Sequence, residues 1–449
     1  MARSLLTIIL AAGEGKRMRS SLPKVLHPVA GLPMVAHVLK TASQAGADDQ
    51  ALVIGNQAEL VRATVEQCGF YPSIHMQKTR EGTAHAVLAA RAAITGVHDD
   101  VLVLYGDVPL IQTSTIEQAR AALAEGADIV DLGFETHDPT GYGRLIMDGD
   151  TLLAIREEKD ANEAERKITF CNSGIMAFRG EHVLDVLDAI RNDNAQGEYY
   201  LTDAVEVGRS RGLKTVAITV PEDETLGVND RVQLAEIESR WQVRRREELL
   251  HSGVTMQAPQ TVWLHHDTRI AADSVIEPNV VFGPGVTLEQ GATIRAFSHL
   301  EDAFVGPEST VGPYARLRPG TVLGRKVKVG NFVETKKAVV ADGAKINHLS
   351  YVGDAKVGAA ANIGAGSVTC NYDGFNKHET VIGAGAFIGT NTSLVAPVTI
   401  GENANTAAGS VVYQNVADDD LAIERSKQIN LPGKAKSLRA RNKATKDGS

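Results

Sequence analysis

The feature that most constrains the fold is a set of apolar residues spaced six positions apart through the second half of the chain. The spacing persists for more than a hundred residues, with only short slips. Its members are Ile270, Ile276, Phe282, Leu288, Ile294, Leu300, Val305, Val311, Leu317, Leu323, Val329, Val340, Ile346, Val352, Val357, Ile363, Ile382, Ile388, Leu394, Ile400 and Val412. A period of six matches neither a helix nor a strand and is typical of a hexapeptide parallel β-helix. We expect each hexad to form one flat side of a triangular coil, with its apolar residue inward and small residues or glycine at the corners.

Two segments depart from this pattern. The stretch "VTCNYDGFNKHETV" (368–381) interrupts the hexads, and insertions in such solenoids project from one face and often serve binding. After Pro432 the chain carries six Lys or Arg residues against Asp447 alone. We expect this basic segment to be a solvated, disordered tail.

The first half of the chain alternates short apolar runs with helical patterns. Strands are expected at 5–12, 51–55, 101–107, 127–134 and 171–178, and helices at 34–45 and 84–93. Such alternation predicts a mostly parallel sheet with helices on both faces. Ligands bind at the carboxyl ends of the strands in such sheets, so Asp107, which ends "YGD", should lie at that edge.

The length, net charge and cysteine content of the chain further restrict the class of protein. At 449 residues the chain should hold two or three domains. We expect a first domain at 1–228, a linker helix at 229–250, which is charged and free of glycine, and a second domain at 251–449 with the tail. The net charge of −9 argues against a nucleic-acid binder. Three scattered cysteines without a CxxC pair favour a reducing compartment, so a cytoplasmic location is expected.

No segment is apolar for long enough to span a membrane. The run from Leu5 to Ala12 could pass for the apolar part of a signal peptide, because Arg3 precedes it and Ala11-Ala12-Gly13 ends it. The residues after this run are dense in charge, and we therefore interpret the run as a first strand.

The segment "LLTIILAAGEGKRMRSSLPKVLH" (5–27) ends that strand in a glycine-rich turn. A P-loop would need glycine at Leu10 and a hydroxyl at Arg17, and a dinucleotide fingerprint would need glycine at Met18. Both interpretations fail. Backbone N–H groups of such a turn can still cradle phosphates, and Arg17 and Lys24 can neutralise them. The small Ala11 and Ala12 would let a planar base approach.

These residues carry a resemblance. "LAAGEGKRM…LPKVLH" is similar to the signature of sugar-1-phosphate nucleotidyltransferases, with Lys16 where that family usually has Thr. "EGTAHA", "YGDVPL", "GYGRL", "CNSGI" and "GVND" agree with it. Together with "RLRPG", "GNFVETKK", "NHLSYVGD" and "NIGAGSVTCNYDG", the chain resembles bacterial bifunctional N-acetylglucosamine-1-phosphate uridyltransferases / glucosamine-1-phosphate N-acetyltransferases. The resemblance implies an α/β Rossmann-like nucleotidyltransferase domain followed by a left-handed parallel β-helix.

For the first domain the resemblance implies transfer of UMP from UTP to N-acetylglucosamine-1-phosphate, with release of pyrophosphate. Arg17 and Lys24 would be catalytic, and Asp107 and Asn229 would hold Mg²⁺. Gly143, Glu157 and Asn172 would hold the sugar, together with Asn229. The nucleotide would contact Leu10, Ala11, Ala12, Gly13, Gln77, Gly82, Thr83, Tyr105 and Gly106.

Taken alone, several of these residues have simpler interpretations. Asp107 could be a turn or helix-cap carboxylate, and Asn229 could be the N-cap of the linker helix, or both ligand and cap. Glu157 lies in a charged run and would by default be solvated. Arg318 and Lys336 could be solvent-facing charges on a coil.

For the second domain the resemblance implies acetylation of glucosamine-1-phosphate by acetyl-CoA, with His348 as the general base. An imidazole titrates near neutral pH and suits that role, although a lone histidine is more often a surface or interface residue. Arg318 and Lys336 would bind the sugar phosphate. Tyr351, Asn362, Asn371 and Tyr372 would line the sugar and thioester pocket. Acetyl-CoA would contact Ala365, Thr390, Ala408 and Arg425, with Thr390 where the family commonly has Ser. Active sites between neighbouring subunits would make the protein a homotrimer.

Two other functions remain open at this stage. A single-activity sugar-1-phosphate nucleotidyltransferase could carry a structural or regulatory β-helix, but such a helix would have no reason to hold "NHLSY", "NIGAG" and "CNYDG". A non-enzymatic scaffold with a degenerate transferase domain is opposed by the intact Lys24, Asp107 and Asn229.

Overall fold

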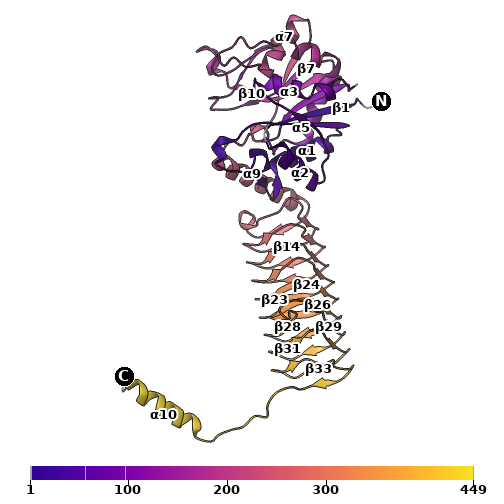
Figure 1. Ribbon diagram of the computed structural model, residues 1–449, viewed down its shortest axis with the longest axis vertical. Coiled ribbons are helices and arrows are strands. Elements are labelled where there is room, and N and C mark those ends of the chain that lie inside the picture. The colour runs from indigo at the N-terminus through magenta and orange to yellow at the C-terminus, as the bar shows by residue number, and fades with distance from the viewer. Residues whose placement is uncertain (1–2, 56, 97, 448–449) are drawn as a thin grey trace. The chain divides into compact units, whose positions relative to one another are not determined.

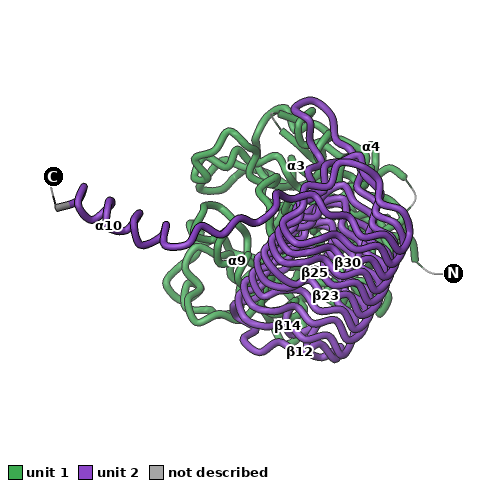
Figure 2. The backbone as a smooth tube through the Cα atoms, turned by 90° about the horizontal axis from the view of Figure 1, so that it is seen from below, with its two compact units in different colours: residues 1–245 green, residues 246–449 purple. Residues whose placement is uncertain are grey.

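The chain consists of two compact units, residues 1–245 and 246–449 (Figure 2). The computed structural model describes residues 3–55, 57–96 and 98–447. In this part of the chain, no helix is long and apolar enough to cross a membrane.

The first unit is built on a nine-stranded mixed sheet. Its main path runs β11 (Thr215–Thr219), β7 (Ile129–Glu135), β10 (Phe170–Arg179), β6 (Asp100–Tyr105), β1 (Leu5–Ala11), β4 (Asp49–Ile54) and β5 (Ser73–Met76). Strand β8 (Arg144–Asp148) joins β10 to β9 (Thr151–Arg156), and β2 (Pro28–Val29) pairs with β3 (Leu32–Pro33) as a separate ribbon. On the main path only β10 runs antiparallel to its neighbours, so the expected mostly parallel sheet is confirmed.

Helices cover both faces of this sheet (Figure 1). The helices are α1 (Met34–Gln44), α2 (Ala58–Gln67), α3 (Thr83–Ala89), α4 (Arg91–Ile94), α5 (Thr113–Ala124), α6 (Val183–Leu187), α7 (Ala204–Ser210) and α8 (Glu222–Thr225). One core joins α1, α2 and α5 to Leu5 and Ile9 of β1, and the other joins α3, α4, α6 and α7 to Leu6 and Ile8. Strand β1 is therefore buried on both faces, and residues 5–11 form a central strand of the fold.

The short strands β5, β8, β9 and β11 were not expected from sequence, because they lack long apolar runs. The expected helix at 84–93 is divided at Ala90 into α3 and α4. A 21-residue helix, α9 (Arg231–His251), follows the last strand of the sheet along the chain, and the boundary between the two units falls within it, after residue 245.

The second unit is a parallel β-helix whose strands stack coil on coil (Figure 1). Its first face consists of β12 (Thr255–Met256), β14 (Val275–Ile276), β17 (Thr293–Ile294), β20 (Thr310–Val311), β23 (Lys328–Asn331), β25 (Lys345–His348), β27 (Asn362–Ile363), β30 (Phe387–Ile388), β33 (Asn405–Thr406) and β35 (Leu421–Ala422). The second face consists of β15 (Val281–Phe282), β18 (His299–Leu300), β21 (Arg316–Leu317), the start of β24 (Glu334–Val340) and of β26 (Tyr351–Val357), β28 (Val368–Cys370), β31 (Ser393–Val395) and β34 (Val411–Val412). The third face consists of β13 (Arg269–Ile270), β16 (Thr287–Leu288), β19 (Ala303–Val305), β22 (Thr321–Leu323), the ends of β24 and β26, β29 (Thr380–Ile382) and β32 (Val398–Ile400).

The strand register explains the hexad spacing. Arg269 pairs with Thr287, eighteen residues on, whereas Lys345 pairs with Asn362, seventeen residues on. A full coil is thus three hexads, and each single-residue slip is a coil with one side shortened. All 21 apolar hexad residues are buried, so the β-helix expectation is confirmed.

The glycines that follow these inward residues do not have the role we expected. They lie where successive coils approach too closely for a side chain: a Cβ on Gly364 would lie 2.5 Å from the carbonyl oxygen of Ile388. Other glycines, among them Gly285 (φ 72°) and Gly320 (φ 80°), do take left-handed corner positions as expected, and larger residues such as Phe332 (φ 56°) and Leu349 (φ 52°) take many of the others. The coil stacking fixes these corners despite the usual cost of that conformation.

Two segments outside the regular coils complete the unit. Ala355 pairs with Thr380, 25 residues on, so residues 368–381 do contain an insertion into one coil. The expectation of a disordered tail is wrong, because α10 (Lys434–Asp447) is a helix. Its Ala, Leu, Lys and Arg residues are strong helix formers, and residues 434–446 are exposed.

Candidate active sites in the two units

A pocket of about 340 Å³ opens at the carboxyl ends of β1 and β6 in the first unit. It brings together ten residues singled out from sequence: Leu10, Ala11, Ala12, Gly13, Lys24, Gln77, Gly82, Thr83, Tyr105 and Asp107. Arg80 and Glu198 also line it, and neither was predicted. The pocket lies where ligands bind in sheets of this kind.

The glycine-rich turn after β1 owes its shape to one position. Gly15 adopts a left-handed conformation (φ 62°), and a Cβ there would lie 2.6 Å from Cβ of Lys24. Only glycine fits such a site without strain. The turn is therefore packed directly against Lys24.

Lys24 connects the two residues expected to bind a metal. Its ammonium forms an ion pair with Oδ2 of Asp107 and lies 3.4 Å from Oδ1 of Asn229. The Lys24 and Asp107 side chains are 12% and 18% exposed, so the pair is largely shielded from water. Two oxygens that already share one cation, from a carboxylate and an amide, form a donor set that suits a hard divalent cation.

The backbone explains how Asn229 reaches this position. The N–H of Val228 donates to the carbonyl of Asp107 at 3.0 Å. The helix-capping interpretation of Asn229 is wrong: Oδ1 of Asp230 accepts from the N–H groups of Val232 and Gln233, both at 2.9 Å. Because Asp230 caps α9, the Asn229 side chain is left to contact Lys24, although Asn229 is not among the residues that line the pocket.

Tyr105 lines the pocket next to the first strand, and Gly106 packs against that strand without lining the pocket. The Gly106 N–H donates to the carbonyl of Leu10 at 2.9 Å, and a Cβ there would meet Ala11 at 3.3 Å. Tyr105 is packed under Gly174. Burial, followed by the charges of Glu157 and Asp107, raises the pKa of Tyr105, so its phenol stays protonated.

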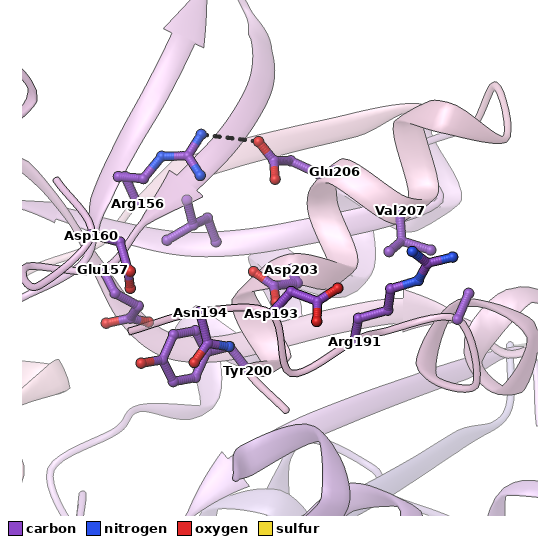
Figure 3. Close-up of a pocket in the computed structure, with 12 residues that line it drawn as sticks. Arg156, Glu157, Asp160, Arg191, Asp193, Asn194, Tyr200, Asp203, Glu206 and Val207 are labelled. Atoms are coloured by element: carbon purple, nitrogen blue, oxygen red, sulfur yellow. Dashed lines mark hydrogen bonds and ion pairs between the residues drawn. The ribbon is translucent and has the colours of Figure 1, made fainter. Parts of the chain in front are cut away.

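The residues expected to hold the sugar are divided between two places. Gly143 and Asn172 are adjacent, because the Asn172 N–H donates to the Gly143 carbonyl at 2.8 Å. Glu157 lines a separate pocket of about 360 Å³ with Asp160, Tyr200 and Asp203 (Figure 3). It is not a solvated charge: burial raises its pKa, although Thr202 donates a hydrogen bond to it at 3.1 Å.

Arg17 does not join this group. It lies exposed on the short 3₁₀ turn Lys16–Met18 and does not line the nucleotide-side pocket.

In the second unit, the expected general base and the expected acetyl-CoA residues lie on one line along a corner of the β-helix. Asn331 pairs with His348, and the His348 carbonyl accepts from Gly366. The line continues coil by coil, because Ala365 accepts from Asn391, Thr390 accepts from Gly409 and Ala408 accepts from the Arg425 guanidinium. In chain order these positions are Asn331, His348, Ala365, Thr390, Ala408 and Arg425.

Asn331 orients His348. Oδ1 of Asn331 lies 2.7 Å from Nδ1 of His348. Nε2 of the exposed imidazole takes no part in this contact. This arrangement suits a general base.

The expected sugar-phosphate residues lie on the adjacent second face. Arg318 donates to Glu334 at 2.8 Å, and Lys336 is on β24, whose register sets it beside Gly353 of β26. The Tyr351 hydroxyl lies over Gly353, because a Cβ there would meet it at 2.3 Å.

Asn371 donates to the hydroxyl of Tyr351 at 3.4 Å and also to Asp354. Asn362 begins β27 on the first face. Tyr372 is exposed in the inserted segment, with the Lys377 ammonium 3.9 Å from its ring centre.

Sequence reasoning missed three residues of these sites. Asn331 could have been found from the coil period, since it precedes His348 by seventeen residues. Arg80 was a cation inside the segment already singled out at Gln77 and Gly82. Glu198 carried no signal, because it belongs to an irregular segment far along the chain.

Comparisons with known proteins agree with this architecture. A family model described as a MobA-like NTP transferase domain matches residues 7–169, and one described as bacterial transferase hexapeptide (six repeats) matches residues 379–414. The fold and sites thus define a two-part transferase, with an NTP transferase domain followed by hexapeptide repeats. A "Bifunctional protein GlmU" from Agrobacterium fabrum is 57% identical over 447 residues, covering 100% of this chain and 99% of the relative. The protein of that name from Bartonella quintana is 50% identical over 439 residues, 98% of each chain.

The chain therefore belongs to the family of bifunctional GlmU proteins. This confirms the expected resemblance, the two-part fold and a bifunctional transferase of UDP-N-acetylglucosamine synthesis that acts on small molecules. Nucleotidyl transfer of this class typically uses a divalent metal.

Proposed function

We propose that the first unit transfers UMP from UTP to N-acetylglucosamine-1-phosphate and that the second acetylates glucosamine-1-phosphate with acetyl-CoA. We assign these activities to residues 1–228 and 251–449, with 229–250 as a linker helix. The observation that carries the first assignment is the cation of Lys24, which lines the pocket with Asp107 and also lies beside Asn229. The acetyl-transfer assignment rests on His348, whose imidazole is oriented by Asn331.

In the first site the nucleotide would lie along the backbone of Leu10 to Gly13, with Gln77, Gly82 and Thr83 around the base and Tyr105 and Gly106 at its edge. The pocket's lining supports this position. Gly143, Glu157 and Asn172 would bind the acetylated sugar. The half-buried, hydrogen-bonded carboxyl of Glu157 supports a role in orienting sugar hydroxyls.

Asp107 and Asn229 would hold Mg²⁺. When bound, the ion would supply neutralisation of the phosphate charge and orientation of the α-phosphate. Lys24 would then turn its ammonium from Asp107 to the phosphate oxygens, and Arg17 would approach from its exposed turn. A phosphate oxygen of the sugar phosphate attacks the α-phosphorus in line, the new P–O bond forms, and the bond to pyrophosphate breaks.

In the second site Nε2 of His348 would remove a proton from the neutral glucosamine amine as the nitrogen attacks the thioester carbonyl, and this proton would pass to the leaving thiolate. The C–N bond forms, the C–S bond breaks and coenzyme A leaves. Arg318 and Lys336 would bind the sugar phosphate, and Tyr351, Asn362, Asn371 and Tyr372 would enclose the sugar. Ala365, Thr390, Ala408 and Arg425 would line the acetyl-CoA path, a role supported by their position on the His348 corner.

We also propose that the protein is a homotrimer whose acetyl-transfer sites lie between coils of neighbouring subunits. Exposed Phe332 and Leu349 on the coil corners supply apolar surface for such contacts. Sedimentation should give a trimer, and a fully active monomer would contradict the proposal.

Two assays on the full-length protein test both activities. Pyrophosphate release from UTP and N-acetylglucosamine-1-phosphate reports the first, and thiol release from acetyl-CoA and glucosamine-1-phosphate reports the second. Asp107→Asn should abolish only the first. His348→Ala should lower only the second, by about 10²- to 10⁴-fold, as expected for loss of a general base.

Matched controls are Asp148→Asn, at the exposed end of β8, and His299→Ala, on the second face of the β-helix. Both should keep both activities. Retained acetyl transfer in His348→Ala would refute its role. Pyrophosphate release without any acetyl transfer in the unmodified protein would identify a single-activity nucleotidyltransferase.

A further inference from the structure

Two cations near the nucleotide pocket have no part in the mechanism above. They are Lys16 and Arg80, and both are paired with the same carboxylate. Nζ of Lys16 lies 2.7 Å from Oε2 of Glu14, while the Arg80 guanidinium forms an ion pair with Oε1. Glu14 thus divides its two oxygens between two basic side chains.

The three residues come from two different walls of the pocket. Glu14 comes directly after Gly13 in the turn after β1, the turn whose backbone is suited to phosphates. Arg80 lies in the segment between β5 and α3 and lines the pocket beside Gly82 and Thr83. The Arg80 side chain therefore crosses from the base-binding wall to the phosphate-binding turn.

Arg80 is also better placed for phosphates than the arginine selected from sequence. Among the arginines that the structure describes, Arg80 is the one that lines this pocket, whereas Arg17 lies outside it. The fixed left-handed conformation of Gly15 holds the turn, and with it the position of Glu14, against Lys24.

The ion pairs are exposed enough to be exchanged. The side chains of Glu14, Arg80 and Lys16 are 36%, 40% and 86% exposed, and pairs in such surroundings contribute little. A guanidinium can bind phosphate oxygens with two parallel hydrogen bonds, and a triphosphate carries more negative charge than a single carboxylate. Hydrogen bonds from Lys16 and then Arg80 lower the pKa of Glu14, so the carboxylate is ionised and would repel a triphosphate unless its cations restrain it.

We propose that Arg80 is a triphosphate-binding residue that Glu14 holds at the pocket mouth in the nucleotide-free protein. Binding of the nucleoside triphosphate exchanges the Glu14 carboxylate for phosphate oxygens on Arg80, and Lys16 keeps Glu14 turned away. Glu14 is thus an internal competitor of the β- and γ-phosphates. This inference rests on the proposed use of the pocket for UTP.

The experiment compares nucleotides that differ only in phosphate number. Calorimetric titration of the full-length protein with UTP and with UMP gives both dissociation constants. Arg80→Gln should raise the dissociation constant of UTP by about tenfold, the size expected for a lost hydrogen bond between charged groups. It should change the dissociation constant of UMP by less than about twofold. Arg80→Lys should recover part of the loss. Arg62→Gln, an exposed arginine paired with Glu66 on α2, is the matched control and should change neither constant.

Glu14→Gln completes the test. The variant should bind UTP a few-fold more tightly. Most of this gain in affinity should be absent in the Glu14→Gln/Arg80→Gln double variant, because without the Arg80 guanidinium there is little for the Glu14 carboxylate to compete for. Three outcomes would overturn the inference. Arg80→Gln could lose affinity equally for UTP and UMP, or lose no affinity for either. Glu14→Gln could bind UTP more weakly than the unmodified protein. An unmodified protein that binds no UTP would overturn both this inference and the proposed uridyl transfer, whereas unchanged UTP binding in Arg80→Gln would overturn this inference alone.

Discussion

The two candidate sites are assembled in opposite ways. In the sheet unit, Lys24 reaches Asp107 and Asn229 across 83 and 205 residues of chain. In the β-helix, Asn331, His348 and Ala365 succeed one another at seventeen-residue intervals on one corner. The first site depends on how the whole domain folds, and the second on how each coil lies on the next. Damage to one charge should therefore be decisive in the first site, and damage to coil packing should stay local in the second.

The largest effect should come from the convergent charge of the sheet unit. Lys24→Ala should lower kcat for pyrophosphate release by about a hundredfold or more, because a preorganised cation at a reacting phosphate is lost. Acetyl transfer should be unchanged, and steady-state assays of both reactions check this. Equal loss of both activities would mean that Lys24 supports folding and not the site, and would break the comparison.

A packing defect in the β-helix should be large in stability but confined in space. Ile346 is fully buried beneath the corner that carries His348. Ile346→Ala should lower the free energy of unfolding by about 2–5 kcal/mol through the cavity it leaves. Acetyl transfer should fall as His348 loses its support, while uridyl transfer persists.

Ile276→Ala is the matched control for this change. Ile276 is equally buried on the same face, four coils earlier along the register from Ile294 through Val311 and Val329 to Ile346. Because each coil contacts only its neighbours, this variant should lose stability and keep acetyl transfer. Similar loss of acetyl transfer in both variants would show that the β-helix transmits damage along its length.

The sequence was most informative where structure repeats. The hexads predicted the buried residues of the β-helix one by one, and a departure from them marked the inserted segment. In the sheet unit the motifs predicted the pocket wall, but Arg80 and Glu198 remained hidden because irregular segments carry no period. Asn229 was ambiguous for a physical reason: Asn and Asp cap helices equally well, and only the hydrogen bonds of Asp230 resolve which residue does so.

The two units should also respond to pH with opposite signs. Burial, then repulsion from Glu206 and Glu157, raises the pKa of Asp203 to about 6 (Figure 3). In the β-helix, hydrogen bonds from Asn376 and His378 lower the pKa of Asp373. A carboxyl whose folded pKa is raised stabilises the fold fully below its unfolded value, near 3.9, and this contribution is lost as the pH rises through about 6.

Asp203→Asn measures this contribution. Between pH 4.5 and 7.5 the unmodified sheet unit should lose about 1 kcal/mol more stability than the variant, an amount reduced from the full linkage value because Asp203 is partly exposed. Scanning calorimetry can follow the transition that shifts on adding UTP. Asp185→Asn, on an exposed position of α6, should keep the unmodified pH dependence. If stability depended on pH identically in all three proteins, Asp203 would not be a source of the pH dependence.

The smallest effect should come from the most conspicuous charge of the opening turn. The Lys16 side chain is 86% exposed and contacts Glu14, not the pocket. Lys16→Thr should therefore change kcat/KM for UTP by less than about threefold, since exposed pairs contribute little. The change should be a rise in KM, because Glu14 would then be free to hold Arg80 more firmly. Steady-state kinetics at low and high salt check both points. If Lys16→Thr proved more damaging than Lys24→Ala, the phosphates would have to bind on the outer side of the turn, and the pocket between Leu10 and Asp107 would not be the site of transfer.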